Sequence, residues 1–450
     1  MGFKKDFLWG AATASYQIEG AYQTAGKGLN IWDSLCREKG RVNHNETGDM
    51  ACDHYHHFKE DITLMKEIGI NAYRFSISWT RILPEGKGNV NPEGIAFYSD
   101  LVDELIKNDI EPIITLFHWD YPMELFKKGG WLNDDSPLWF EEYVKVVIDA
   151  LSDRVTYWIT LNEPQIFTNH GHRLGVHAPF VNYPNEELLH IIHNVLLSHG
   201  RAVKTIRKYG AKKPLIGFAP TALPYIPKNS TENAIKEARE KTFGLYINDS
   251  FCWGNSMWMD PVFLGDYPKE AYETFGHEMP VMTPEDKEII TSPLDFLGLN
   301  TYESTVTNKE SDPYQGNSYV GSPRTGMDWS VIPEALYWSP KFMSERYDIP
   351  VMITENGLAN NDWVNLDGNV HDPQRIDFTH RYLKELKRAA DDGIDIIGYM
   401  HWSLLDNFEW NYGYDKRFGL IHVDYLTQKR TIKDSAYWYK GVICENGECL

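Results

Sequence analysis

Cysteine is scarce in this chain: its 450 residues include five cysteines, an odd number scattered along the sequence. Such a set in a long chain is not a disulfide framework, so we expect reduced thiols. The N-terminal residues lack the apolar core of a secretory signal, and no apolar run reaches the roughly 20 residues that a membrane span needs. The sequence therefore predicts a cytoplasmic protein with no membrane partner.

Basic charge is also in short supply, with 44 lysines and arginines against 64 aspartates and glutamates and a formal net charge of −20. Nucleic-acid phosphates would be repelled by this excess of acid, as would anionic membrane surfaces. Histidines gather at 54–57 and 170–177, but neither stretch contains an H-E-x-x-H or a well-spaced set of carboxylates. Structural or rim positions are favoured over a metal site, and we expect no metal or organic cofactor.

What the sequence does contain is a series of short apolar segments that alternate with amphipathic helical patterns. The expected strands are 7–14, 71–78, 112–117, 155–159, 215–219, 294–300, 351–357 and 394–400. The expected helices are 55–68, 92–108, 137–151, 185–209, 231–252, 333–346, 373–390 and 434–443, with a long polar loop at 303–330.

These strands are apolar runs rather than alternations, which is typical of buried parallel strands. No linker or low-complexity tract separates them. We therefore predict an α/β protein with one domain over residues 1–450, a (β/α)₈ TIM barrel whose site lies at the C-terminal ends of the strands. A doubly wound open sheet is the alternative, but no G-x-G-x-x-G turn follows an early strand.

Two of the expected strands lead directly into a glutamate. Glu163 lies in the stretch Thr160–Pro164, and Glu355 lies in a similar layout at 351–357. In a barrel both carboxyls would reach one face, where one could protonate a leaving oxygen while the other attacks or activates water, as in a glycosidase. Arg74 and the hydroxyl of Tyr302 would keep one of the two ionised, and the sequence alone leaves open which.

Other strand ends carry amide, imidazole, carboxylate and indole groups, which suit the hydroxyls and flat faces of sugars. These residues are Gln17, His118, Trp119, Asn162, Asn300, Trp402, Glu409 and Trp410. Because the strand ends of a barrel converge, we expect these side chains to surround the two carboxyls.

Several motifs repeat a known pattern from end to end of the chain. They are FLWGAA at 7–12, QIEG at 17–20, RFSISW at 74–79, HWD at 118–120, TLNEP at 160–164, ITENG at 353–357 and WSLLDNFEW at 402–410. In these motifs the chain resembles glycoside hydrolase family 1, the β-glucosidase family.

The resemblance implies roles that spacing does not. Glu163 would be the general acid/base and Glu355 the nucleophile of a retaining reaction, with the two carboxyls about 5–5.5 Å apart. Asn162 would bind the sugar 2-hydroxyl, and Tyr302 would hold Glu355 with Arg74 close by. The further substrate contacts would come from Gln17, His118, Glu409 and Trp410 at the other hydroxyls, Trp402 as stacking platform, Trp329 on the aglycone side, and Trp119, Asn300 and Phe418.

Departures from the family pattern bear on the substrate. The family's 6-phosphoglycosidases have a small residue at the position of Glu409 and grip phosphate with Ser, Lys and Tyr, whereas here only Lys416 fits that set. An acid at 409 would repel phosphate, so an unphosphorylated sugar is favoured. Tyr121 and Phe180 replace the usual Leu and Gly, and this leaves the shape of the entrance open.

The expected function is that of a retaining exo-β-glucosidase. Its substrates would be cellobiose, short cello-oligosaccharides and aryl β-glucosides, with β-galactosides and β-fucosides left open. A 6-phospho-β-glucosidase and a non-catalytic sugar-binding barrel are the alternatives. The expected partner is this small carbohydrate, and a homo-oligomer is left open.

Overall fold

Eight parallel strands close into a barrel in a computed structural model that describes residues 2–245, 251–306 and 321–450. The strands are β1 (Leu8–Ala12), β2 (Ala72–Ser76), β3 (Glu111–Thr115), β4 (Tyr157–Asn162), β5 (Leu215–Ala219), β7 (Phe296–Asn300), β9 (Val351–Asn356) and β10 (Ile396–Trp402). They follow one another in the order β1-β10-β9-β7-β5-β4-β3-β2. The predicted (β/α)₈ barrel is confirmed.

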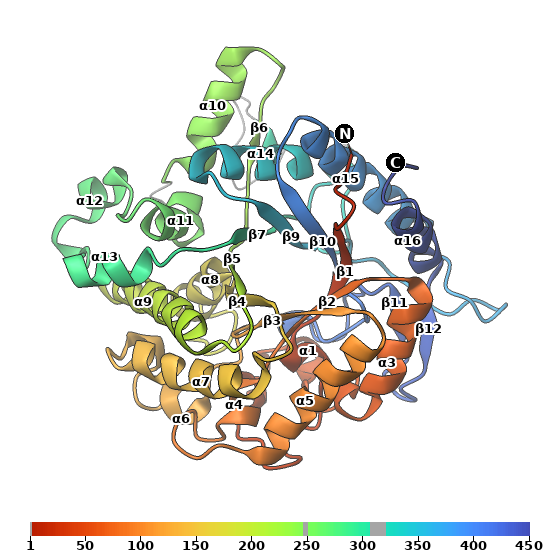
Figure 1. The fold of residues 1–450 in the computed structure, drawn as a ribbon, viewed down its shortest axis with the longest axis horizontal. Helices are drawn as coiled ribbons and strands as arrows, with labels where there is room; N and C mark the ends of the chain where they lie inside the picture. The colour runs from red at the N-terminus through yellow and green to blue at the C-terminus, as the bar shows by residue number, and fades with distance from the viewer. Residues whose placement is uncertain (1, 246–250, 307–320) are drawn as a thin grey trace.

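Helices lie around the outside of these strands (Figure 1). The longer ones are α3 (His54–Ile68), α5 (Pro92–Lys107), α7 (Ser136–Leu151), α9 (Asn185–Tyr209), α10 (Glu232–Phe243), α11 (Asn255–Phe263), α14 (Ala335–Tyr347), α15 (Pro373–Asp391) and α16 (Asp434–Cys444). The shorter ones are α1 (Ser15–Ile18), α2 (Ile31–Leu35), α4 (Trp79–Ile82), α6 (Met123–Phe126), α8 (Pro164–Ile166), α12 (Lys269–Phe275) and α13 (Pro284–Ile290).

Two small sheets lie outside the barrel. β6 (Tyr225–Ile226) pairs in parallel with β8 (Thr305–Val306), and β11 (Ile421–Val423) pairs antiparallel with β12 (Arg430–Ile432). The first pair joins the loops that follow β5 and β7. The second pair lies between β10 and α16 in the chain.

Local chemistry explains where the helices start and stop. α5 begins where the side chain of Asn91 accepts a hydrogen bond from the Glu93 backbone N–H, with Pro92 in the first turn. α3 ends at Gly69, whose φ of 76° lies in the left-handed region that glycine adopts without strain. Both signals are present in the sequence, and the predicted bounds of these helices agree with the structure to within a residue or two.

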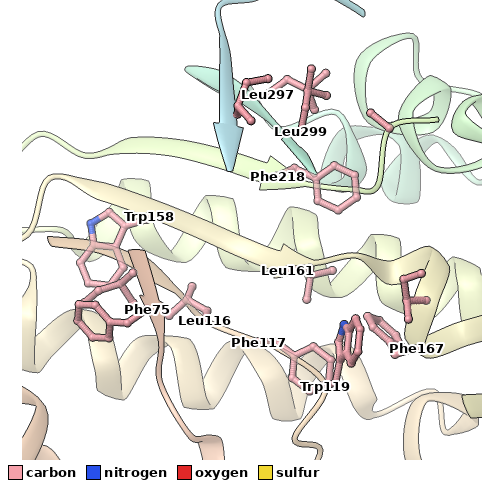
Figure 2. Close-up of a cluster of buried hydrophobic side chains, with 14 of the residues drawn as sticks. Phe75, Leu116, Phe117, Trp119, Trp158, Leu161, Phe167, Phe218, Leu297 and Leu299 are labelled. Carbon is pink, nitrogen blue, oxygen red and sulfur yellow. The ribbon is translucent and has the colours of Figure 1, made fainter. Parts of the chain in front are cut away.

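The core forms two layers. Side chains that fill the barrel interior include Ala12, Ala72, Ile113, Ile159, Ala219, Phe296, Met352 and Met400. The strands send alternate side chains outward, where they pack against the helices. Figure 2 shows part of this outer layer, with Phe75 and Trp158 toward one end and Phe117, Trp119 and Phe167 toward the other.

The alternation in β2 places a charged side chain inside the barrel. Ala72 belongs to the interior layer, whereas Tyr73 and Phe75 pack in the outer layer. Arg74 therefore points inward, with 1% of its surface exposed. A buried guanidinium needs carboxylate and carbonyl partners, so its presence indicates a polar interior near the strand ends.

The main difference from the prediction concerns the segment after β5. The helix expected at 231–252 is α10, which ends at Phe243 before Gly244, and residues 246–250 lie outside the described residues. In the loop expected at 303–330, residues 307–320 also lie outside them. Among the helices that the structure describes, none is both long and apolar enough to span a bilayer.

Candidate active site

The strand ends are irregular at the points where polar side chains are needed. The pairing of β4 with β5 shifts between Ile159 and Asn162, and that of β7 with β9 shifts between Leu299 and Asn300. A bulge re-aims the side chains that follow it. Asn162 and Asn300 are consequently buried at the mouth of the barrel, where their side-chain amides form a hydrogen bond with each other.

A cavity of about 480 Å³ opens at these strand ends. Its inner part is lined by His118, Trp119, Glu163, Asn300, Tyr302, Glu355, Trp402, Glu409, Trp410 and Phe418. Its outer part is lined by Ile166, His170, His177, Thr221, Leu223, Tyr225, Lys241, Thr242, Trp253, Asn255, Met327 and Trp329, among others. The size and the mix of aromatic and polar groups suit a small polar ligand.

Both oxygens of the Glu355 carboxylate are held by donors. Arg74 Nη1 donates to Oε1 at 2.7 Å, and the Tyr302 hydroxyl donates to Oε2 at 2.8 Å. Burial raises the pKa of Glu355 above its usual value, and the charge of Arg74 and the hydrogen bond from Tyr302 offset part of this rise. Each donor favours the ionised form, so this carboxyl is arranged to carry a negative charge.

Glu163 has a different environment. Burial and then the charge of Glu355 raise its pKa well above the usual range, and a hydrogen bond from Asn300 opposes this only in part. Its backbone is left-handed, at φ 43° and ψ 64°, and its N–H donates to the Ala219 carbonyl at 2.8 Å. One carboxyl of the pair is therefore arranged to hold a proton and the other to remain ionised.

A chain of hydrogen bonds determines the tautomer of His118. Arg74 Nη2 donates to Asn162 Oδ1 at 2.6 Å, and because arginine only donates, this assigns the orientation of the Asn162 amide. Asn162 Nδ2 then donates to His118 Nε2 at 3.0 Å, so the neutral ring carries its hydrogen on Nδ1. Burial, and then the charge of Arg74, lower the pKa of His118 well below its usual value. Nδ1 is buried and has no hydrogen-bond partner within the described ranges.

Glu409 also lines the cavity and lies beside Gln17. Gln17 Nε2 donates to the Phe408 carbonyl at 2.9 Å and to Glu409 Oε2 at 3.2 Å. Burial, then the charge of Glu355, raise the pKa of Glu409 to about 8. Glu409 lines the cavity, and Gln17 lies behind it with Oε1 buried and without a partner among the residues that the structure covers.

Aromatic rings form the walls. Trp402 stacks on His118 with ring centroids 5.8 Å apart, and Trp119 packs against Trp410 at 4.5 Å. Trp119 Nε1 donates to the Asn162 carbonyl at 3.1 Å, so its polar group is already used and its ring serves as wall. On the outer side, Trp329 contacts Tyr302 at 5.2 Å. Phe418 packs against both of these rings, at 6.3 Å from Tyr302 and 6.2 Å from Trp329.

The structure brings the residues named from the sequence to one place. Those that line the cavity are Glu163, Glu355, His118, Trp119, Asn300, Tyr302, Trp329, Trp402, Glu409, Trp410 and Phe418. Gln17, Arg74 and Asn162 lie directly behind them, through hydrogen bonds to Glu409, Glu355 and His118.

Apart from Trp329, the residues of the outer wall were not predicted. Thr221 follows β5, so the strand-end rule that identified Glu163 could have found it. Lys241 and Thr242 belong to α10, and Trp253 and Asn255 to the segment beyond it, where no pattern indicates which side chains face a cavity. These residues come from the loops after β4 and β5, which are long and irregular.

The histidine stretches form no metal site in the described ranges, where no group of three or more ligating side chains occurs. His170 and His177 lie with their rings 4.9 Å apart at the cavity wall. His54 Nδ1 pairs with Asp61 at 2.7 Å outside the cavity.

The two departures at 121 and 180 lie behind the cavity wall. Tyr121 is buried against Trp131 at 4.8 Å, and Phe180 contacts Trp32 at 6.0 Å. Trp32 in turn contacts the cavity residue Trp410 at 4.7 Å. Phe180 therefore contacts the cavity wall through the ring of Trp32 and through its N–H, which donates to the carbonyl of the cavity residue His177 at 2.7 Å.

Comparisons with known proteins agree with this geometry. The family model described as Glycosyl hydrolase family 1 matches residues 1–448. The chain is 43% identical over 448 residues to 1,4-beta-D-glucan glucohydrolase of Thermotoga neapolitana, covering 99% of each chain. It is 43% identical over 453 residues to Beta-glucosidase A of Acetivibrio thermocellus, again covering 99% of each. The structure of a beta-glucosidase from Thermotoga maritima in complex with glucoimidazole superposes with a TM-score of 0.90 at 42% identity, covering 99% of each chain.

Proposed function

The chain belongs to glycosyl hydrolase family 1, and on that premise we propose that it is a retaining exo-β-glucosidase. It releases a terminal β-D-glucosyl residue from the non-reducing end of cellobiose, short cello-oligosaccharides and aryl β-glucosides. The names of the relatives, beta-glucosidase and 1,4-beta-D-glucan glucohydrolase, support this substrate class. In this proposal residues 1–450 act as one catalytic domain, and the cytoplasmic location stays a prediction from the sequence.

The reaction takes two displacements at the anomeric carbon. In the first, a Glu355 oxygen bonds to that carbon while the bond to the aglycone oxygen breaks and Glu163 gives its proton to this oxygen. In the second, a water molecule gives a proton to Glu163, and the water oxygen bonds to the anomeric carbon while the ester bond to Glu355 breaks. Two inversions give net retention.

The difference between the two carboxyls is the observation that carries the proposal. Arg74 and Tyr302 donate to opposite oxygens of Glu355 and favour its charge. Burial and that same charge raise the pKa of Glu163, which favours a protonated acid next to an ionised nucleophile. The chemistry requires one protonated and one ionised carboxyl, and the surroundings of these two glutamates favour that difference.

The glucosyl unit is bound at the inner end of the cavity. Asn162 binds the 2-hydroxyl beside Glu163, and Trp402 provides the stacking face. The remaining hydroxyls are bound by Gln17, His118, Glu409 and Trp410, with Trp119 and Asn300 completing this end. Trp329 and Phe418 line the path to the aglycone.

A phosphorylated glucosyl unit is the alternative that the charges oppose. Glu409 offers a phosphate no positive partner, and in its ionised form it would repel one. Lys416, the residue that could attract one, donates its Nζ to the Gly326 carbonyl at 2.6 Å and lies over the ring of Tyr412 at 5.2 Å. An unphosphorylated glucoside is the better match.

Two assays test the proposal. Hydrolysis of p-nitrophenyl β-glucoside should exceed that of its 6-phosphate at least about tenfold in kcat/KM, and the reverse order would assign the 6-phospho activity. Proton NMR of the first-formed glucose should show the β anomer, and first-formed α-glucose would refute the retaining mechanism. Binding of cellobiose with no glucose release over hours would instead indicate a non-catalytic sugar-binding barrel.

A further inference from the structure

We propose that Gln165 is a positioning residue for Glu163, because its side-chain amide fastens the loop that carries Glu163 to the end of the neighbouring strand. Gln165 Nε2 donates to the Thr221 carbonyl at 3.0 Å, and Gln165 Oε1 accepts the Thr221 N–H at 3.2 Å. The side chain is fully buried, with none of its surface exposed. The inference rests on the proposed acid/base role of Glu163.

The amide continues the sheet where the backbone cannot. The pairing of β4 with β5 ends at Asn162, and the next bond is the one from Glu163 N–H to the Ala219 carbonyl. Pro164 follows and has no N–H to offer. Gln165 then supplies from its side chain a donor and an acceptor for the backbone of Thr221, just beyond the end of β5. A side-chain amide is suited to this task, since it presents a donor and an acceptor in one plane.

Glu163 needs this support because its own backbone is strained. A φ of 43° is uncommon for a residue with a side chain, and such a conformation persists only where the surroundings hold it. Glu355, in contrast, lies within β9 and has a donor on each carboxylate oxygen. The direction of the Glu163 carboxyl therefore depends far more on the backbone that carries it.

The two hydrogen bonds between Gln165 and Thr221 also relate Glu163 to Asn300. Thr221 forms an isolated parallel bridge with Asn300, whose carbonyl accepts the Ala222 N–H at 2.9 Å. Asn300 also gives the side-chain hydrogen bond that lowers the pKa of Glu163. When Gln165 ties Glu163's loop to Thr221, it sets both the place of the carboxyl and its distance from this amide.

A substitution that keeps the length of the side chain but removes the amide tests the inference. In Gln165→Met we expect kcat/KM for cellobiose, whose leaving group needs a proton, to fall about 10–100-fold. The value for 2,4-dinitrophenyl β-glucoside, whose leaving group departs without one, should change less than about threefold. Azide attacks the glycosyl-enzyme without a general base, so it should raise the kcat of the variant on the dinitrophenyl substrate.

A merely structural role makes a different prediction. If Gln165 only stabilises the fold, both substrates lose equally per active site and azide has no effect, and this result would overturn the inference. Active sites are counted by titration with 2,4-dinitrophenyl 2-deoxy-2-fluoro-β-glucoside, so unfolded protein does not enter the rates. Should Gln165→Met yield no folded protein, Gln165→Asn keeps the amide one methylene short of Thr221 and must show the same selective loss.

Asn71→Leu is the matched control. At the opposite end of the barrel, the side-chain amide of Asn71 also bonds to backbone groups of a neighbouring segment. Its Oδ1 accepts the Trp9 N–H at 2.8 Å, and its Nδ2 donates to the Phe7 carbonyl at 3.2 Å. We expect this variant to keep the wild-type ratio between the two substrates. Glu163→Ala distinguishes failure of the acid/base assignment from failure of the role of Gln165. If kcat/KM falls equally for both substrates in Glu163→Ala as well, the acid/base assignment is wrong. If the loss is selective for cellobiose in Glu163→Ala but not in Gln165→Met, only the role of Gln165 is refuted.

Discussion

Arg74 and Glu355 form a buried ion pair across the interior of the barrel, with Arg74 Nη1 2.7 Å from Glu355 Oε1. Arg74 lies on β2 and Glu355 on β9, and β1 and β10 separate these strands in the barrel. The guanidinium also donates to the Thr354 carbonyl, to Thr115 and to Asn162. One side chain therefore holds the nucleophile proposed for this enzyme together with the residue next to its acid/base.

Arg74→Lys should slow the reaction and shift its pH dependence. Lysine keeps a charge but cannot reproduce the planar fork that reaches Glu355 and Asn162 together. Because Arg74 lowers the pKa of Glu355, a weaker partner lets that pKa rise, so the acid limb of kcat/KM should move to higher pH. We expect a loss of about 10–1,000-fold at neutral pH in assays with p-nitrophenyl β-glucoside.

Arg81→Lys is the control for this variant. Arg81 is also a fully buried arginine with a carboxylate partner, Glu19, at 3.0 Å, but Glu19, unlike Glu355, does not line the cavity. Arg81→Lys should lower the melting temperature while leaving the acid limb in place. A shift of the limb in Arg81→Lys, or its absence in Arg74→Lys, would contradict the role of Arg74.

Removing the Glu355 carboxylate should abolish turnover and allow chemical rescue. Glu355→Gly loses the attacking oxygen, so hydrolysis of p-nitrophenyl β-glucoside should fall at least about 1,000-fold. Azide can enter the vacated space and attack from the same side, and the product should then be the α-glucosyl azide, which NMR identifies. A β-configured azide, or no rescue at all, would count against Glu355 as nucleophile.

Removing the hydroxyl of Tyr302 should lower kcat/KM measurably. Tyr302→Phe removes the donor to Glu355 Oε2 and leaves the ring that contacts Trp329. A hydrogen bond to a charged group is worth about 1.5–3 kcal/mol, so kcat/KM should drop about 10–150-fold. Tyr439→Phe removes a similarly buried hydroxyl, which donates to the Gly10 carbonyl outside the cavity, and should leave kcat/KM within about threefold.

The sequence was sufficient for the barrel because each strand is a continuous apolar run and the helices carry ordinary start and stop signals. It was sufficient to expect the two glutamates in one cavity, because both follow such runs. β5 has the bounds that were expected, Leu215–Ala219, and α9 agrees at both ends as well. In a barrel, knowing the strand ends is nearly the same as knowing which residues meet.

Other parts of the site depend on structure that has no simple periodicity. Three such features each involve one or two residues that depart from the regular pattern of their element. They are the bulge in β4 near Asn162, the left-handed backbone of Glu163 and the hydrogen bonds from the Gln165 side chain to Thr221. Gln165 in particular is an ordinary polar residue in the sequence. Its role follows only from two hydrogen bonds to Thr221, 56 residues further along the chain.

Glu409 should make the protein less stable as the pH rises. Its pKa is about 8 in the folded protein, where burial and the charge of Glu355 oppose ionisation, against the 4.5 of an ordinary glutamate. Below about pH 4.5 the group is protonated in both states and has no effect on the free energy of unfolding. Between about pH 4.5 and 8 the folded state binds the extra proton, so stability falls as pH rises, and above 8 the full penalty remains.

Glu409→Gln should remove this dependence, because glutamine keeps the acceptor for Gln17 but carries no charge. Its melting temperature should match that of the wild type near pH 5 and exceed it at pH 9, where the gain in unfolding free energy should be about 1–5 kcal/mol. Glu85→Gln, at an exposed position, controls for the change in net charge and should give no such trend. A difference between Glu409→Gln and wild type that stays constant from pH 5 to 9 would show that the Glu409 carboxyl titrates as an ordinary glutamate.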